Sequence, residues 1–273
     1  MNLKKIIKDN LSQIYALTER HTKLKMRFKY TVIVSFITPI FTILMPIIVI
    51  SAFFEVKDSL GHWTKETYFV YLFIAYNISL IQRIIRDLPN QLRLEKFWKT
   101  LPALIIGPFN RFNLLFGIFF SEIILIAIPF TIFFILCYIM YPISFLTILF
   151  VLGVFFLIAL IFCGIGLMMG IFAISKENFW KTFHFVISLV IWLSCLTYPY
   201  EMFPESLQRI IDLNPLYYII DFLRFLWIEN NVIISITSHP VHLLILIIVS
   251  FLVPSIGVYV FNYIYKKYGV VGY

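Results

Sequence analysis

The sequence predicts an all-α membrane protein with six transmembrane helices, an amphipathic helix before them and a re-entrant helical hairpin before the last one. Three observations predict this class. Hydrophobic residues make up 61% of the 273 positions, and charged residues only 13%. The apolar residues form blocks of about 20 residues, the helical length that crosses a hydrocarbon core about 30 Å thick. Lysine and arginine gather between alternate blocks, as they do at the cytoplasmic ends of transmembrane helices.

The first 29 residues are expected to form a cytoplasmic amphipathic helix at the membrane surface, ahead of a six-span domain over residues 30–273. Apolar residues recur at helical spacing from Leu3 to Ile14, and polar residues fill the other face. The segment lacks the apolar core and the cleavage pattern of a signal peptide, so we expect it to stay on the protein. It acts either as a passive anchor or as a strut that leads to a partner.

Six apolar segments have the length of transmembrane helices. The second is the shortest and carries a polar side chain, Asn77. The fourth contains Gly166 and Gly170, a pair that lets another helix approach closely, and we expect that helix to belong to the same chain. The predicted spans are residues 30–54, 67–82, 112–141, 143–174, 179–198 and 241–265.

The distribution of cations predicts that both termini are cytoplasmic. Of the 22 lysines and arginines, 18 lie before the first span, after the last one, or in segments 83–111 and 176–181, which share one side of the membrane. Cations near span ends are retained on the cytoplasmic side. We therefore expect a multi-pass protein of the plasma membrane, whose net charge of +8 faces membrane lipid rather than nucleic acid.

The cytoplasmic segment 83–111 is predicted to be a coupling loop that docks to a soluble motor. It contains six cations, two acids and proline breaks at positions 89, 102 and 108. A rigid linkage requires a short helix that buries aromatic anchors in a cleft of its partner. The expected anchors are Phe97 and Trp98, and the expected polar rim around them consists of Arg93, Glu95, Lys96 and Lys99. The alternative is a plain solvated loop.

Residues 199–227 are too apolar for a soluble loop, yet they contain prolines and charges that a plain transmembrane helix would not accept. Two short helices that dip into the outer leaflet and are separated at Asn214-Pro215 would satisfy both constraints. We expect this segment to be an outer gate, with Asp212 and Arg224 paired at its polar rim. The expected gate residues are Tyr198, Pro199, Glu201, Pro204, Asp212, Asn214, Pro215 and Arg224.

Glu122, beside Ser121 in the third span, is the one clearly intramembrane acid in the sequence. It lies about 15 Å into the predicted helix, where an ionised side chain is costly unless it is paired or hydrated. Glu122 is either a functional acid on a polar path or a carboxyl group hydrogen-bonded to Asn113, Asn77 or a tyrosine. We favour the hydrogen-bonded carboxyl.

Two stretches carry a resemblance to a known family. The succession YPYEMFPESLQRIIDLNPLYYIIDFLR, residues 198–224, resembles the extracellular re-entrant segment of type-2 ABC exporter permeases, with its Tyr/Phe-Pro step, amphipathic turn, Asn-Pro and closing arginine. The stretch LEKFWKTLPALIIGPFNRF, residues 94–112, resembles the coupling loop of that family, although Lys99 stands where glycine is usual and Pro102 where glutamate is usual.

The resemblance implies a transmembrane permease subunit of an ATP-driven exporter that moves a drug, a lipid or a lipid-linked glycan outward. It also implies a second permease copy, as a homodimer or a close paralogue, and two copies of a separate ABC ATPase subunit. The chain has no Gly-x-x-x-x-Gly-Lys-Ser/Thr loop, so ATP and Mg are expected to be used by that partner, and no cofactor is expected in this chain.

Signatures of other functions are missing from the sequence. Neither a Gly-x-Ser-x-Gly nor a His-Glu-x-x-His motif occurs, and we expect no catalytic residue. The three cysteines lie in apolar spans, and His239 and His242 have no third ligand near them in sequence, so we expect no metal site. The alternative function is a six-span membrane enzyme or scaffold that acts on lipid without ATP.

Overall fold

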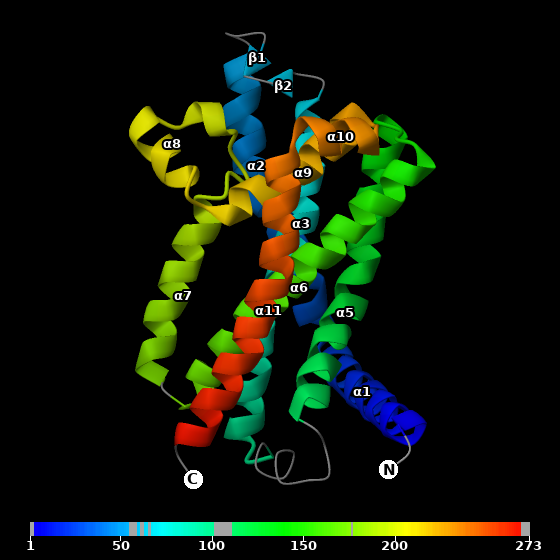
Figure 1. Cartoon of the computed structure of the whole chain (residues 1–273), viewed down its shortest axis with the longest axis vertical. Coiled ribbons are helices and arrows are strands. Elements are labelled where there is room, and N and C mark those ends of the chain that lie inside the picture. The colour runs from blue at the N-terminus through cyan, green and yellow to red at the C-terminus, as the bar shows by residue number, and fades with distance from the viewer. Residues whose placement is uncertain are drawn as a thin grey trace.

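The computed structural model describes residues 3–54, 59–60, 63–64, 67–100, 111–175 and 177–268, which form a bundle of helices (Figure 1). Two short strands, β1 (Ser59–Leu60) and β2 (Trp63–Thr64), pair antiparallel between the second and third helices of the bundle. The helices are α1 (Leu3–Met26), α2 (Lys29–Phe54), α3 (Tyr68–Phe97), α5 (Arg111–Met140), α6 (Phe145–Ser175), α7 (Glu177–Trp192), the 3-10 helix η1 (Tyr200–Met202), α8 (Glu205–Ile211), α9 (Pro215–Glu229), α10 (Val232–Ser238) and α11 (Pro240–Tyr268).

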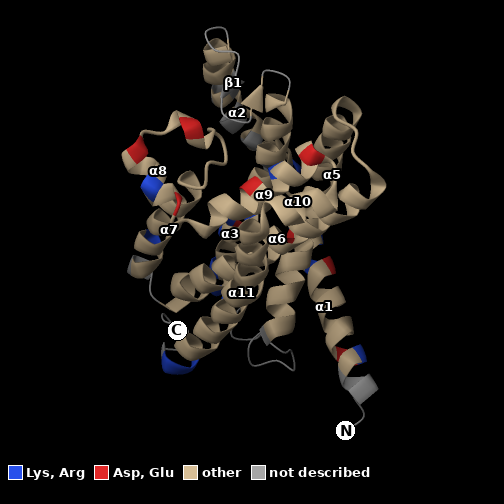
Figure 2. Ribbon diagram, turned by 45° about the horizontal axis from the view of Figure 1, so that its top comes forward, with Lys and Arg blue, Asp and Glu red and all other residues tan. Residues whose placement is uncertain are grey.

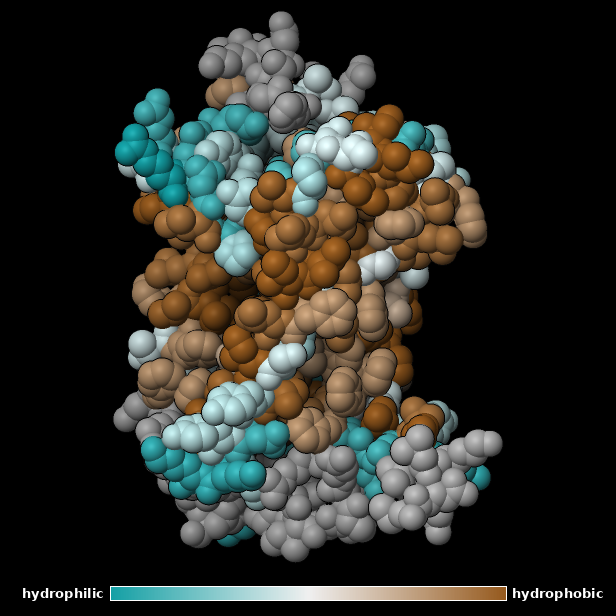
Figure 3. All heavy atoms as spheres, viewed as in Figure 1, coloured by the Kyte–Doolittle hydropathy of each residue, from teal (hydrophilic) through white to brown (hydrophobic). Residues whose placement is uncertain are grey.

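Four helices of the described chain are long and apolar enough to cross a membrane, namely α3, α5, α6 and α11. On the face in Figure 3, hydrophobic side chains form a broad belt around the middle of the molecule, with hydrophilic side chains toward both ends. The predicted class, an all-α membrane protein, is therefore confirmed. The helices α2 and α7 cover the first and fifth predicted spans, and their crossing of the membrane stays a prediction.

The centre of the bundle is the crossing of α3 and α6. A Cβ atom added at Gly166 would lie 3.2 Å from the carbonyl oxygen of Ile84, and one added at Gly170 would lie 2.7 Å from Cδ1 of Leu92. The two glycines therefore let α3 approach α6 closely, as expected of small residues between membrane helices. The prediction that this pair packs within the chain is confirmed.

A second close approach joins α6 to α11. A Cβ atom added at Gly257 would lie 2.5 Å from the carbonyl oxygen of Gly164, and one added at Gly164 would lie 2.7 Å from the Cα atom of Pro254. Here backbone meets backbone, so neither neighbour can rotate a side chain away. This contact fixes the last helix against the centre of the bundle.

Pro89 does not break its helix, contrary to the prediction. The helix α3 continues through it from Tyr68 to Phe97, so the second span and the start of the coupling segment form one element. Proline removes one helical hydrogen bond, but membrane helices tolerate it where a neighbouring helix packs against the site. Pro89 is buried, and a Cβ atom at Gly170 of α6 would lie 3.8 Å from its Cα atom.

The first helix docks on the bundle instead of lying alone. Leu17 is buried against α5, where a Cβ atom added at Gly117 would lie 2.5 Å from the Leu17 Cβ atom. The side-chain amide of Asn113 donates to Asn10 Oδ1 at 2.9 Å and to Gln13 Oε1 at 2.7 Å. The opposite face exposes an apolar stripe at helical spacing, made of Ile7, Leu11 and Tyr15. This stripe suits the predicted position at a membrane surface.

Candidate functional site

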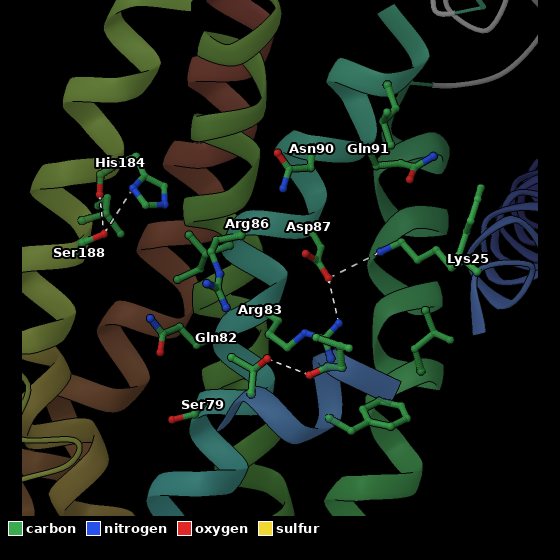
Figure 4. Close-up of a pocket in the computed structure, with 18 of the residues that line it drawn as sticks. Lys25, Ser79, Gln82, Arg83, Arg86, Asp87, Asn90, Gln91, His184 and Ser188 are labelled. Carbon is green, nitrogen blue, oxygen red and sulfur yellow. Dashed lines mark hydrogen bonds and ion pairs between the residues drawn. The ribbon is translucent and has the colours of Figure 1, made fainter. Parts of the chain in front are cut away.

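A cavity of about 750 Å³ lies between α3, α7 and the junction of α1 and α2 (Figure 4). Residues three and four apart share one side of a helix, and the polar residues of the α3 wall follow this spacing. They face His184 and Ser188, which lie one turn apart on α7. Ser188 Oγ donates a hydrogen bond to the His184 carbonyl oxygen at 2.8 Å. The polar residues on the α3 wall are Ser79, Gln82, Arg83, Arg86, Asp87, Asn90 and Gln91.

Some of the charged residues in the cavity wall form ion pairs, and one does not pair with any described residue. Asp87 Oδ2 lies 3.4 Å from an amino group of Arg83 and 3.7 Å from Lys25 Nζ, so two cations share this carboxylate. Arg86 also lines the cavity, is exposed, and makes no ion pair with any residue that the structure describes. In Figure 4 its guanidinium group lies in the space between α3 and α7.

Sequence reasoning missed this cavity. The readable signal was the helical spacing of the polar residues from Ser79 to Gln91, which marks one polar face of α3. The residues that face it from α7 and from the end of α1 are far away in sequence. Their placement depends on how the helices pack, which no local pattern contains.

Glu122 is buried, with 1% of its surface exposed, and forms an ion pair with Lys25 of α1. The expected hydrogen bond to Asn113, Asn77 or a tyrosine is therefore corrected to a salt bridge with a lysine from outside the span. Lys25 can reach this position because α1 packs against α5. Since Lys25 also approaches Asp87, it connects α1, α3 and α5 at the edge of the cavity.

Glu95 is fully buried near the end of α3. The prediction that it belongs to an exposed polar rim is therefore wrong. Its carboxylate oxygens lie 2.9 and 3.2 Å from the two amino groups of Arg20 of α1, and the Thr100 hydroxyl also donates to it. A carboxylate at the negative end of a helix dipole requires such partners. Burial and the positive charge of Arg20 lower the pKa of the neighbouring His21 to about 4, so its ring is neutral near pH 7.

Two of the predicted coupling residues bind the end of α3 to neighbouring helices. The guanidinium carbon of Arg93 lies 4.8 Å from the centre of the Trp180 ring of α7. Lys96 Nζ donates to the carbonyl oxygen of Ile174 at 3.3 Å, near the end of α6. Both residues therefore hold the end of α3, the end of α6 and the start of α7 together, while they remain partly or fully exposed.

The remaining three coupling residues are exposed at the C-terminal end of α3. Phe97 has 80% of its surface exposed and Trp98 has 45%. Lys99 follows with a φ of 57°, in the left-handed region that commonly ends helices and favours glycine. The backbone here explains why glycine suits the position that Lys99 occupies. Two aromatic side chains thus project at the tip of the same helix that forms the cavity wall.

Arg224 is buried, with 1% of its surface exposed, in the segment after α7. Its guanidinium group donates to the carbonyl oxygens of Cys195 and Leu196 at 2.8 and 3.0 Å, and its central carbon lies 3.7 Å from the centre of the Tyr71 ring of α3. Its nearest acid is Asp221, at 3.8 Å. Arg224 therefore joins the end of α7 to α3 and α9.

The predicted pair of Arg224 with Asp212 at an exposed rim is wrong, because Arg224 is buried and its nearest acid is Asp221. Asp212 instead accepts a hydrogen bond from the Tyr200 hydroxyl at 3.3 Å, and its carbonyl oxygen accepts one from the Tyr218 hydroxyl at 2.9 Å. These bonds hold η1 and α9 to the turn after α8. Asp212 thus organises the turn on the outer surface.

The predicted break at Asn214-Pro215 is present, since α8 ends at Ile211 and α9 begins at Pro215. The Asn214 side chain accepts from the backbone amide of Leu216 at 3.1 Å and donates to the Val190 carbonyl oxygen at 2.7 Å. It therefore starts α9 and ties this helix to α7. The other predicted gate residues lie along the same segment: Tyr198 and Pro199 before η1, Glu201 within it and Pro204 directly before α8.

These features define a helical membrane protein with an amphiphilic cavity and an exposed aromatic tip on one central helix. The chain belongs to the ABC-2 type transporter family, whose model matches residues 12–227. It is thus the transmembrane component of an ABC transporter, and members of this family usually work with an ABC ATPase. A comparison with curated proteins found no match. The matched range contains most of α1, the cavity, the end of α3 and the outer segment through Trp227.

Proposed function

We propose that the chain is the permease subunit of an ATP-driven exporter in the plasma membrane. The observation that carries this proposal is the exposed Phe97-Trp98 pair at the tip of α3, the helix that also forms one wall of the cavity. A motor that holds this pair would move the cavity wall directly. Two permease copies and two ATPase subunits would then alternate between closed and outward-open forms as ATP and Mg are used by the ATPases.

The orientation proposed here places both termini and the tip of α3 in the cytoplasm. In Figure 2 acidic residues colour the ribbon around α8 at one end of the molecule, and basic residues colour the end of α11 at the other. Cations on the cytoplasmic side and acids on the outer side are the distribution that membrane insertion favours. The segment from η1 to α9 is then an outer gate that dips into the outer leaflet.

We expect Leu213→Cys to react with a membrane-impermeant maleimide on intact cells, and Lys23→Cys to react only after the membrane is opened. Both positions are exposed, on opposite sides in the proposed orientation. The three native cysteines are free and buried, so they contribute little background. The reverse pattern of labelling would overturn the orientation.

We expect Phe97→Ala combined with Trp98→Ala to abolish most of the ATPase activity that co-purifies with the tagged chain. Aromatic anchors of an interface each contribute about 2 kcal/mol or more to binding, so the pair should weaken docking at least about 100-fold. The measurement is ATP hydrolysis in the purified complex, together with the amount of bound ATPase. Because Trp98 also lines the cavity, Phe97→Ala alone should show part of the loss.

Phe145→Ala is the matched control. Phe145 lies at the start of α6, and 75% of its surface is exposed, compared with 80% for Phe97. Unchanged co-purification by the double variant would show that the motor docks elsewhere. If the native chain brings down no ATPase at all, the exporter proposal fails, and the alternative of a membrane enzyme or scaffold that acts on lipid without ATP takes its place.

A further inference from the structure

The position of the cavity along α3 places its polar side chains near the inner surface of the membrane. The apolar part of α3 begins at Tyr68, and about 20 helical residues cross the hydrocarbon core. In the proposed orientation the inner boundary of the core therefore falls close to Asp87. Arg83, Arg86 and Asn90 then lie at the depth of the inner lipid headgroups.

The cavity has apolar as well as polar walls. On α7, Ile187 and Ile191 follow His184 by about one and two turns in the outward direction. Val34 and Phe36 of α2 add apolar surface to the same cavity. A ligand with a polar head and an apolar tail therefore finds partners for both of its parts in this cavity.

The charge pattern favours an anionic head. Asp87 is the one carboxylate among the described residues that line the cavity, and it is already shared by Arg83 and Lys25. Lys25 is further neutralised by Glu122. Arg86 has no such partner among the residues described, so the cavity holds one positive charge in excess. An arginine guanidinium group binds phosphate through paired hydrogen bonds, and it does so more strongly beside apolar surface than in open water.

We propose that this cavity binds an amphiphile whose phosphate head carries a net negative charge and that enters from the inner leaflet, with its phosphate on Arg86 and with His184 and Ser188 as further hydrogen-bonding partners. The cavity volume lies in the range that holds a small organic ligand, so it accommodates a headgroup and part of one chain. The inference rests on the proposed function, because it names the substrate class of the exporter. It assigns Arg86 as the residue that selects that class.

The test compares ligands that share an acyl chain but differ in head charge. The native chain, purified with its ATPase in lipid nanodiscs, is titrated with lysophosphatidic acid, with lysophosphatidylcholine and with inorganic phosphate, and bound ligand is counted by native mass spectrometry. We expect lysophosphatidic acid to bind at least about tenfold more tightly than lysophosphatidylcholine, since a charge-assisted contact is lost or offset in the second ligand.

Arg86→Gln should remove this tenfold preference, and Arg86→Lys should keep most of it. Arg209→Gln is the matched control, because it makes the same change at an exposed arginine of α8, outside the cavity. A preference that survives Arg86→Gln would overturn the proposal. Inorganic phosphate that competes as well as the lysolipid would overturn the amphiphile and leave a site for free phosphate.

This binding measurement requires no ATP hydrolysis, so it separates the two proposals. Loss of the preference in Arg86→Gln with unchanged ATPase co-purification supports both. A clear preference in a chain that brings down no ATPase would support the ligand class and contradict the exporter. The melting temperature of each variant, measured alongside, identifies any that fail to fold.

Discussion

Replacing Arg224 with leucine is expected to cause one of the largest losses of stability of any single substitution in the half of the molecule that contains α8 and α9. The leucine would leave the carbonyl oxygens of Cys195 and Leu196 buried without their donor, and it would remove the cation from the Tyr71 ring. Each buried unsatisfied polar group costs about 1–3 kcal/mol, and a desolvated cation–π contact contributes up to about 2 kcal/mol. We expect the apparent melting temperature to fall by roughly 10 °C.

The control for this variant is Arg209→Leu, which removes an exposed arginine and should change the melting temperature little. Arg224→Lys should recover only part of the loss, because an ammonium group cannot reach both carbonyl oxygens as the planar guanidinium group does. If Arg224→Leu also stops export while the ATPase still binds, the outer segment acts as the proposed gate. A melting curve that matches the native one would show that Arg224 does not hold this segment together.

Replacing Lys25 with methionine is expected to be comparably damaging where α1 packs on α5. Methionine preserves the length of the apolar stem, but it leaves the buried carboxylate of Glu122 without its cation. Removing one partner of a buried ion pair costs about 3–5 kcal/mol, largely through the remaining unpaired charge. We expect α1 to detach from α5 and to be cut readily by protease in detergent.

The second-site variant Lys25→Met with Glu122→Gln should recover much of the lost stability, because it removes the unpaired charge as well. The double-mutant cycle over Lys25 and Glu122 isolates their interaction, since each substitution alone breaks the same contact. Lys23→Met serves as the control, because Lys23 pairs with Glu19 on the exposed face of the same helix. Additive effects of the substitutions at Lys25 and Glu122 would show that the ion pair contributes nothing.

The features that were predictable from the sequence are those set by local composition. Membrane helices are recognised by length and hydropathy, and the break at Asn214-Pro215 follows from a proline that lacks an amide hydrogen and an asparagine that caps a helix. The exposed aromatic pair at Phe97 and Trp98 was also readable, because it stands at the end of the apolar and basic pattern.

The pairings of polar residues between distant helices were not predictable. Arg20 meets Glu95 across 75 sequence positions, and Arg224 meets Cys195 across 29. A charged residue in an apolar stretch indicates that a partner exists, but its identity depends on which helices pack together. Pro89 shows the same limit, because its place inside a helix depends on the neighbouring glycines of α6.

The helix α3 connects the two ends of the molecule as a lever. Its contact with Gly166 and Gly170 centres near Leu88, while Phe97 marks its C-terminal tip and Tyr71 contacts Arg224 near its N-terminal end. At 1.5 Å per residue, the arm from Leu88 to the tip is about 14 Å and the arm to Tyr71 is about 26 Å. If α3 tilts as a straight rod about this pivot, a displacement of Phe97 moves Tyr71 in the opposite direction. The displacement of Tyr71, beside Arg224, is then about twice as large. The position of two glycines would thus convert a small displacement at Phe97, such as a bound ATPase would cause, into a larger one at Tyr71.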